Sequence, residues 1–323
     1  MIGKHHVKVS NRKVHFSFDI TRNITVIRGD SATGKTTLIN LLSEYENFGK
    51  QSGVTLVCDK RCRVLTEVDW EIRLQNMKDS IIFIDEGNRF IKSTDFARCV
   101  RESDNYYVII TRESLYNLPY SVEEIYEMRK IRHNMTLGKV YNGIRKFYSD
   151  IPVENNRITD TETIITEDSN SGHEFFLHVA DQNGIHCISA HGKSNIFQSV
   201  QGLKGKQKIC IIADGAAFGA EMDRLYKLQA VQPGRITMYL PESFEWLILK
   251  SDMIHDQAVR EILSSPEEHI DSAVYFSWEQ YFTQLLTERT TDTYMRYTKE
   301  QLNRFYLQNS NVKKILETIE TIS

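Results

Sequence analysis

The chain has 323 residues, more than one typical hydrophobic core supports, so its length predicts two domains. Its 41% hydrophobic content is that of an ordinary globular protein, and its net charge of −3 gives no overall basic character for binding nucleic acid. No apolar run approaches the roughly 20 residues that span a bilayer, and the first residues lack the apolar stretch of a signal peptide. We therefore expect a cytoplasmic protein without membrane contact.

A glycine-rich run near the start fits the phosphate-binding P-loop pattern G-x-x-x-x-G-K-[ST]. Residues 23–27 are typical of a buried strand leading into it, and residues 37–42 of a helix leading out. Strand, loop and helix N-terminus would together surround phosphates with backbone N–H groups. The nucleotide-binding residues that we predict are Gly29, Asp30, Ser31, Ala32, Thr33, Gly34, Lys35, Thr36 and Thr37.

Two side chains of this loop have specific expected roles. Lys35 would reach the β- and γ-phosphates of ATP, and the Thr36 hydroxyl would ligate Mg²⁺. The alternative is a chance glycine turn, against which the flanking strand and helix patterns both argue.

A P-loop also needs an acid on a second strand. Residues 80–84 predict a buried parallel strand, and Asp85 and Glu86 follow its end. Asp85 would hold Mg²⁺, and Glu86 would polarise the attacking water as a general base. In the alternative interpretation, Glu86 only caps the next helix.

Residues 106–110 predict a third strand, which ends in Thr111 and Arg112. We predict that Thr111 senses the γ-phosphate and that Arg112 stabilises charge during the reaction. The alternative for Arg112 is an ion pair with a surface acid.

These motifs resemble the P-loop ATPases that carry a glutamate after the second motif, a division that includes the AAA+, RecA and ABC families. The resemblance covers about residues 10–125, including a strand pair at residues 13–20 and 24–27. It implies an α/β fold with a parallel sheet. Because the sequence has no LSGGQ-like signature, it implies a compact ATPase core rather than an ABC dimer. Such ATPases often complete their sites between subunits, so we expect a homo-oligomer or a multi-protein complex.

Residues 126–157 form a basic stretch with interspersed aromatic residues, which is one pattern of a DNA or RNA surface. The alternative is a strand pair with a solvated basic face. We interpret the stretch as a connector that ends in a linker over residues 149–156.

A second α/β pattern follows. Strands are predicted at residues 163–166, 185–189, 208–213 and 236–240, with helices between them, which indicates a small parallel sheet. Glu167 and Asp214 follow two of these strands, and two carboxylates at such an edge suit a divalent metal with oxygen ligands. In the alternative interpretation both residues only cap helices.

Glu167, in the run TEDSNSG, and Asp214, in DGAAFG, resemble the acids of the TOPRIM domain of primases, topoisomerases and OLD-family nucleases. The runs HGKSNI and PESFEWL resemble the defence nucleases that contain this domain. The resemblance covers about residues 160–250 and implies a metal site that uses Mg²⁺ or Mn²⁺. Ala216 occupies the position of the second Asp in the D-x-D pair of that family.

Residues 266–323 are predicted to be helical, as a cap on the second domain or as a nucleic-acid surface. The expected organisation is an ATPase domain (1–125), a basic connector (126–157), a TOPRIM-like domain (158–265) and a helical region (266–323).

The leading functional hypothesis is an ATPase whose ATP cycle gates metal-dependent processing of DNA or RNA, as in phage defence or mobile-element proteins. The alternative is an ATP-driven regulatory or scaffold subunit whose TOPRIM-like domain cannot cleave and recruits a separate effector. A nucleotide kinase is less supported, because the sequence shows no lid or arginine cluster for a second phosphate substrate.

Overall fold

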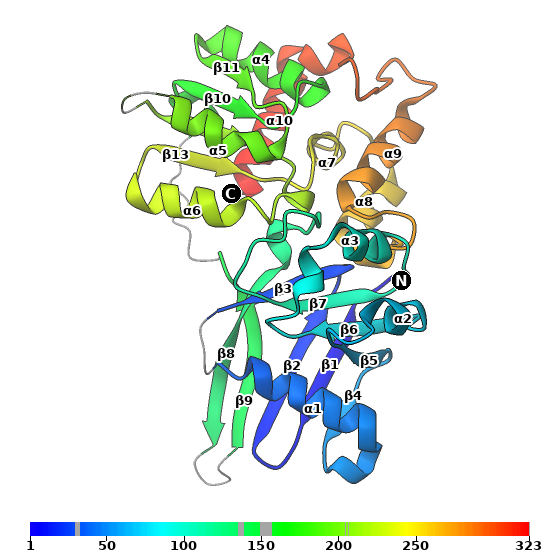
Figure 1. Ribbon diagram of the computed structural model, residues 1–323. Helices are drawn as coiled ribbons and strands as arrows, with labels where there is room; N and C mark the ends of the chain where they lie inside the picture. The colour runs from blue at the N-terminus through cyan, green and yellow to red at the C-terminus, as the bar shows by residue number, and fades with distance from the viewer. Residues whose placement is uncertain (30–32, 135–138, 149–156, 204, 206, 323) are drawn as a thin grey trace. The chain divides into compact units, whose positions relative to one another are not determined.

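The computed structural model describes residues 1–29, 33–134, 139–148, 157–203, 205 and 207–322. The chain forms two compact units, shown in Figure 1. Unit 1 contains residues 1–151 and 265–276, and unit 2 contains residues 152–264 and 277–323. The chain therefore leaves unit 2 after residue 264 and enters it again at residue 277, a division that differs from the four consecutive segments expected from the sequence.

The strands of unit 1 form one mixed sheet in the order β4-β1-β2-β9-β8-β3-β7-β6-β5. Their bounds are β1 His5–Ser10, β2 Val14–Ile20, β3 Ile24–Arg28, β4 Thr55–Val57, β5 Arg61–Leu65, β6 Ser80–Ile84, β7 Tyr106–Ile110, β8 Ile125–Asn134 and β9 Lys139–Lys146.

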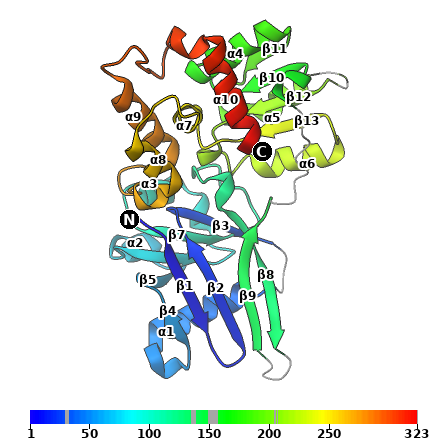
Figure 2. The same cartoon turned by 180° about the vertical axis from the view of Figure 1, so that it is seen from behind.

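The part of this sheet from β8 to β5 agrees with the expected parallel arrangement. Strands β3, β7 and β6 are buried along their whole length, because both faces of these nearly continuous apolar runs are covered. The remainder corrects the expectation of a purely parallel sheet. Strand β1 pairs antiparallel with β2 and β4, and β8 pairs antiparallel with β9. Figure 2 shows these pairs from behind.

Both faces of the β7 region are covered. Helix α1 (Lys35–Phe48) buries Leu38, Leu41 and Leu42 in a core that it shares with β1, β2 and β7, because the sheet curls around that side. On the other face, α2 (Trp70–Gln75) and α3 (Thr94–Arg101) contribute Trp70 and Phe96, and the Phe96 ring packs edge to face with the rings of Trp70 and Tyr107.

The basic stretch after residue 125 is part of this sheet and not a connector. Strands β8 and β9 pair with each other over most of their length, and their outer neighbours are β3 and β2. This arrangement corresponds to the strand-pair alternative. The linker expected at residues 149–156 lies outside the described residues.

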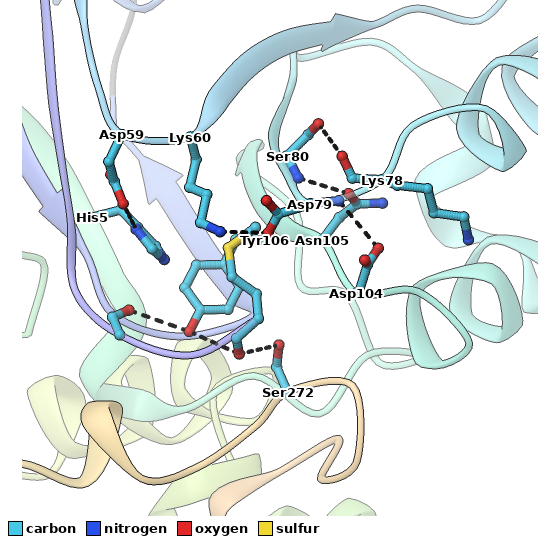
Figure 3. A network of polar contacts seen from close by, with 12 residues as sticks. His5, Asp59, Lys60, Lys78, Asp79, Ser80, Asp104, Asn105, Tyr106 and Ser272 are labelled. Carbon is cyan, nitrogen blue, oxygen red and sulfur yellow. Dashed lines mark hydrogen bonds and ion pairs between the residues drawn. The ribbon is translucent and has the colours of Figure 1, made fainter.

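Residues 265–276 belong to unit 1 although they are distant from it in sequence. The Gly3 N–H donates to the Glu267 carbonyl at 2.8 Å, and the Ser272 hydroxyl donates to the Met1 carbonyl at 3.0 Å. Figure 3 shows Ser272 in the polar network that also contains Tyr106 of β7. This return segment is therefore fixed to the N-terminal strand and to the centre of the sheet.

Unit 2 contains a smaller, fully parallel sheet in the order β11-β10-β12-β13. The bounds are β10 Thr163–Thr166, β11 His186–Ser189, β12 Ile209–Ile212 and β13 Ile236–Tyr239. Its helices are α4 Ser171–Asn183, α5 Lys193–Gly202, α6 Met222–Val231, α7 Phe244–Lys250, α8 Gln257–Ser264, α9 Trp278–Thr290 and α10 Asn309–Ile322. The strand–helix alternation predicted for this region is confirmed. Within the described residues, no helix has both the length and the apolar composition needed to cross a bilayer.

Candidate functional site

Three strands of unit 1 bring the predicted nucleotide-site residues to one edge of the sheet. Ile27 of β3 pairs with Ile110 of β7, and Ile109 pairs with Ile84 of β6. Because these strands are parallel and in register, the residues that follow them lie at the same carboxyl edge. Strand β7 lies between β3 and β6, so Thr111 follows the strand between the loop and the two acids.

The described part of the glycine-rich loop has the backbone that its glycines permit. Gly29 has a φ of 120° and Gly34 a φ of 100°, values that side chains with a Cβ rarely adopt. Helix α1 begins immediately afterwards at Lys35, and its first N–H groups have no partner within the helix. Asp30, Ser31 and Ala32 lie outside the described residues.

The Lys35 ammonium is buried and donates a hydrogen bond to the carbonyl of Gly29. This hydrogen bond connects the first residue of the glycine-rich loop to the first residue of α1. Thr36 and Thr37 are exposed on the first turn of α1. This end of the sheet carries a fixed positive charge and the partial positive charge of a helix N-terminus, which together suit an anion.

The two acids after β6 have different environments. The Asp85 carboxylate accepts the N–H of Glu86 at 2.8 Å, whereas Glu86 forms an ion pair with Arg112, with 3.0 Å between Oε1 and Nε. The short 3₁₀ helix over Arg89–Lys92 begins after Asn88, so Glu86 does not cap it. Arg112 does pair with an acid, but that acid is the predicted general base.

Thr111 is buried, and its N–H donates to the Ile27 carbonyl of β3 at 3.2 Å. Its hydroxyl accepts the N–H of Glu113 at 3.0 Å, which fixes the side chain at the strand end. Five of the predicted residues that the structure describes thus follow three strands at one sheet edge: Gly29, Lys35, Thr111, Asp85 and Glu86.

Unit 2 brings its two predicted acids into direct contact. Strands β10 and β12 are parallel neighbours, and the N–H of Asp214 donates to the Glu167 carboxylate at 3.1 Å. The Asp214 carboxylate also accepts the N–H of Phe244, the first residue of α7, at 3.2 Å. Asp214 therefore contributes to the N-terminus of that helix, in part as the helix-capping alternative expects.

A cavity of about 30 Å³ lies beside these acids, with room for one or two water molecules or a cation with its water. Glu245 of α7 lines it and is only 2% exposed, and its Oε1 accepts the hydroxyl of Tyr297 at 2.7 Å. Lys299 also lines the cavity, and its ammonium pairs with Glu279 of α9 at 2.6 Å.

The carboxyl groups around this cavity disfavour one another's charge. Burial raises the pKa of Glu167 to about 7, and the neighbouring Glu279 adds to the effect. Burial, followed by the charges of Glu279, Glu167 and Glu245, raises the pKa of Asp214 well above its ordinary value. Burial disfavours the Lys299 ammonium, but the carboxylate of Glu279 outweighs it and raises the lysine pKa.

The donor chemistry of this region fits a divalent cation that prefers oxygen ligands, because the carboxyl groups of Glu167, Asp168, Asp214 and Glu245 line the cavity and that of Glu279 pairs with Lys299. As the side chains stand, the described residues contain no three His, Cys, Asp or Glu groups arranged to hold a metal. Ala216, at the position that the second Asp of the D-x-D pair has in the TOPRIM domain, is buried after β12. A metal would therefore require small rotations of the carboxylates that are present.

Four residues of the cavity region were not predicted from the sequence: Glu245, Glu279, Tyr297 and Lys299. Glu245 lies in the run PESFEWL, whose resemblance to defence nucleases implies no role for this acid. Tyr297 and Lys299 lie in the non-helical stretch between α9 and the 3₁₀ helix over Arg304–Leu307, and no local pattern marks them. They reach the cavity because Ser171 of α4 binds the Lys299 carbonyl, through its N–H at 3.0 Å and its hydroxyl at 3.0 Å.

No protein-family model matches this chain, and no curated protein matches its sequence.

Proposed function

We propose that unit 1 binds and hydrolyses ATP. The observation that supports this most strongly is the shared edge of three in-register strands, where Lys35, Thr111 and the Asp85–Glu86 pair follow β3, β7 and β6. A cation and a helix N-terminus next to two acids are the groups that phosphoryl transfer to water requires.

Each group has a distinct role in this proposal. Lys35 and the first N–H groups of α1 bind the β- and γ-phosphates, so Lys35 exchanges the Gly29 carbonyl for a phosphate oxygen. Thr36 and Asp85 would hold Mg²⁺, which supplies positive charge to the phosphates. Glu86 orients water when Arg112 leaves their ion pair for the γ-phosphate, and Thr111 contacts that phosphate from the strand between.

For unit 2 we infer metal-dependent processing of DNA or RNA. Glu167 and Asp214 would hold Mg²⁺ or Mn²⁺, which would supply positive charge to a phosphodiester. The buried Glu245 would provide the acid that Ala216 lacks. The raised pKa values of Glu167 and Asp214 support this inference, because burial and neighbouring carboxylates disfavour the charge of both groups and a divalent cation would offset that effect.

The path of the chain supports gating of unit 2 by ATP. Phe276 ends the return segment, and its carbonyl accepts the side-chain amide of Asn23 at 2.9 Å, one residue before β3. The Arg101 guanidinium lies 5.1 Å from the Phe276 ring centroid. Helix α9 begins two residues later and carries Glu279, the partner of Lys299. A shift of β3 would therefore reach Glu279 through the residues that follow Phe276 in the chain.

A specific observation also favours the regulatory or scaffold alternative. The Lys299 ammonium already neutralises part of the carboxyl cluster, as a metal would, and Ala216 removes one acid. In that case unit 2 is a binding domain stabilised by its own lysine, and cleavage belongs to a recruited effector. In either case the protein acts as a homo-oligomer or within a larger complex.

The test of the ATPase proposal is phosphate release by the purified chain with ATP and Mg²⁺. Glu86→Gln should keep ATP binding and slow turnover by about 10²- to 10⁴-fold, because a general base is lost. Glu113→Gln is the matched control, since Glu113 is an exposed acid at the same sheet edge that pairs with Lys92. Unchanged turnover in Glu86→Gln would remove Glu86 from the base role.

A further inference from the structure

Two of the five free cysteines stand on either side of one short turn in unit 1. Cys58 follows β4 directly, and Cys62 is the second residue of β5. Cys58 is half-buried and open to reagents, whereas Cys62 is buried behind it. Neither thiol has a part in the ATPase or nucleic-acid proposals.

Ion pairs fix the turn between the two cysteines, as Figure 3 shows. The Asp59 carboxylate lies 2.7 Å from Nδ1 of the buried His5, and the Lys60 ammonium lies 2.5 Å from the Asp79 carboxylate. These contacts hold the backbone of the turn against β1 and against the start of β6. The spacing of the two thiols is therefore set by the fold rather than by a loose loop.

The surroundings of the two thiols differ, and they favour Cys58 as the attacking thiol and Cys62 as the resolving thiol. A hydrogen bond from the Cys62 thiol lowers the pKa of Cys58, although burial and Asp59 act in the opposite direction. The same hydrogen bond, together with burial, raises the pKa of Cys62. A reactive thiolate next to a second thiol is the arrangement that disulfide exchange uses.

Both cysteines line a cavity of about 390 Å³, large enough for a small molecule. Lys60, Arg61 and Arg63 also line it, and the one acid among the described lining residues is Glu46 of α1. Glu46 is already engaged, because it accepts the N–H of Val64 at 2.9 Å and pairs with Arg63 at 3.0 Å. Of the three lining cations, Lys60 is paired with Asp79 and Arg63 with Glu46, so Arg61 is the cation that an acidic ligand beside Cys58 would meet.

We propose that Cys58 and Cys62 form a redox-active dithiol that exchanges with small acidic disulfides, for which glutathione disulfide is the probe. The Cys58 thiolate attacks one sulfur of the probe, whose S–S bond breaks, so that a Cys58–glutathione bond forms and a glutathione thiolate leaves and takes up a proton. Cys62 then loses its proton to solvent and attacks the Cys58 sulfur, which expels the second glutathione and forms the Cys58–Cys62 bond. The protein loses two hydrogens and two glutathione molecules are produced. This reaction does not depend on the function proposed for either unit.

The test uses the full chain, reduced and then incubated with glutathione disulfide. Remaining thiols are alkylated, and the mass of the proteolytic peptide that contains Cys58 and Cys62 is measured by mass spectrometry. We expect this peptide to lose two hydrogens, whereas Cys99 is alkylated. In Cys62→Ser, glutathione should remain bound to Cys58. It should add to Cys58 about ten times faster than to Cys99, a half-buried thiol whose pKa is raised by burial.

A second comparison tests the charge of the cavity. Glutathione disulfide should react with Cys58 faster than the cationic disulfide cystamine, and Arg61→Ala should reduce that difference. Wild-type protein that never loses two hydrogens would overturn the proposal, whatever the variants do. Equal rates at Cys58 and Cys99, or equal rates with the two disulfides, would overturn it as well.

Discussion

The two strand edges that carry the candidate sites have opposite electrostatic characters. In unit 1 the edge presents the Lys35 ammonium and the N-terminus of α1, and the Glu86 carboxylate is exposed and paired. In unit 2 the edge presents Glu167 and Asp214 with raised pKa values, and the Lys299 ammonium offsets part of the negative charge around the cavity. The charges at the first edge suit an anion, and those at the second suit a cation.

This difference shows that the carboxyl edges of parallel strands can carry opposite charges within one chain. Parallel strands always bring their carboxyl ends together, but the residues immediately after each strand decide the ligand. A positive-φ glycine turn that leads into a helix supplies N–H groups in unit 1. Strand ends followed by acids in unit 2 supply oxygens, and the raised pKa values of those acids result from placing them together in a buried site.

The largest effect should come from removing the cation of unit 1. Lys35→Ala should weaken ATP binding by on the order of 100-fold, because a buried charge partner of the phosphates is lost. Isothermal titration with a non-hydrolysable ATP analogue measures this. Mn²⁺ binding should not change, and Lys50→Ala, an exposed lysine of the same unit, is the control. Normal ATP affinity in Lys35→Ala would sink the assignment of the P-loop.

The acids of unit 2 should make its stability depend on pH. Because the folded pKa of Glu167 is raised to about 7, its contribution to stability is complete below the unfolded pKa and is lost as pH rises through 7. We expect a loss of about 2 kcal/mol between pH 5 and pH 8, and a smaller loss in Glu167→Gln. Denaturant titration at the two pH values measures this, and equal slopes with pH in both proteins would contradict the assigned environment.

Replacing Lys299 tests whether its ammonium occupies the place of a metal ion among the carboxyl groups of unit 2. Lys299→Gln should raise the Mn²⁺ affinity of the chain about tenfold, because the ammonium no longer competes for the carboxylates. Lys250→Gln, on the exposed end of α7, should have no effect. If neither the wild type nor Lys299→Gln binds Mn²⁺, the regulatory alternative replaces the metal-dependent one.

The smallest effect concerns the connection between the units. If ATP changes Mn²⁺ affinity, Asn23→Ala should reduce that coupling by about 1 kcal/mol while leaving ATP affinity intact. Asn117→Ala is the matched control, since its amide also donates to backbone carbonyls within unit 1. The same coupling in wild type and Asn23→Ala would exclude the return segment as the path.

The features that could be predicted from the sequence are those whose signal is local. The strand, glycine turn and helix around Lys35 are adjacent in the chain, and the two acids directly follow a buried run. The alternation of strands and helices likewise predicted that Glu167 and Asp214 share an edge. Strand β1, which was not predicted, also has a local signal in the alternation of buried Val7 and Val9 with exposed residues.

The features that were missed depend on long-range packing. The place of the β8–β9 pair between β3 and β2 in the large sheet has no local signal, although a strand pair here was one of the two interpretations of the sequence. The return of residues 265–276 to unit 1 rests on contacts between residues far apart in the sequence, among them the ion pair of Asp271 with the Met1 ammonium at 2.8 Å and hydrogen bonds to Met1, Gly3 and Asn23. Lys299 and Tyr297 lie at the cavity because this part of the chain is hydrogen-bonded to α4. The Lys299 ammonium and the Tyr297 hydroxyl find their carboxylate partners only in the folded protein.

We propose that ATP in unit 1 controls metal-dependent action on nucleic acid in unit 2. The most direct measurement incubates the protein with labelled DNA and RNA, including tRNA, and Mg²⁺ or Mn²⁺, with and without ATP. A Glu167→Ala/Asp214→Ala variant is the control. We expect cleavage that ATP alters and that the control loses. Phosphate release from ATP without any cleavage, or cleavage that persists in the control, would contradict it.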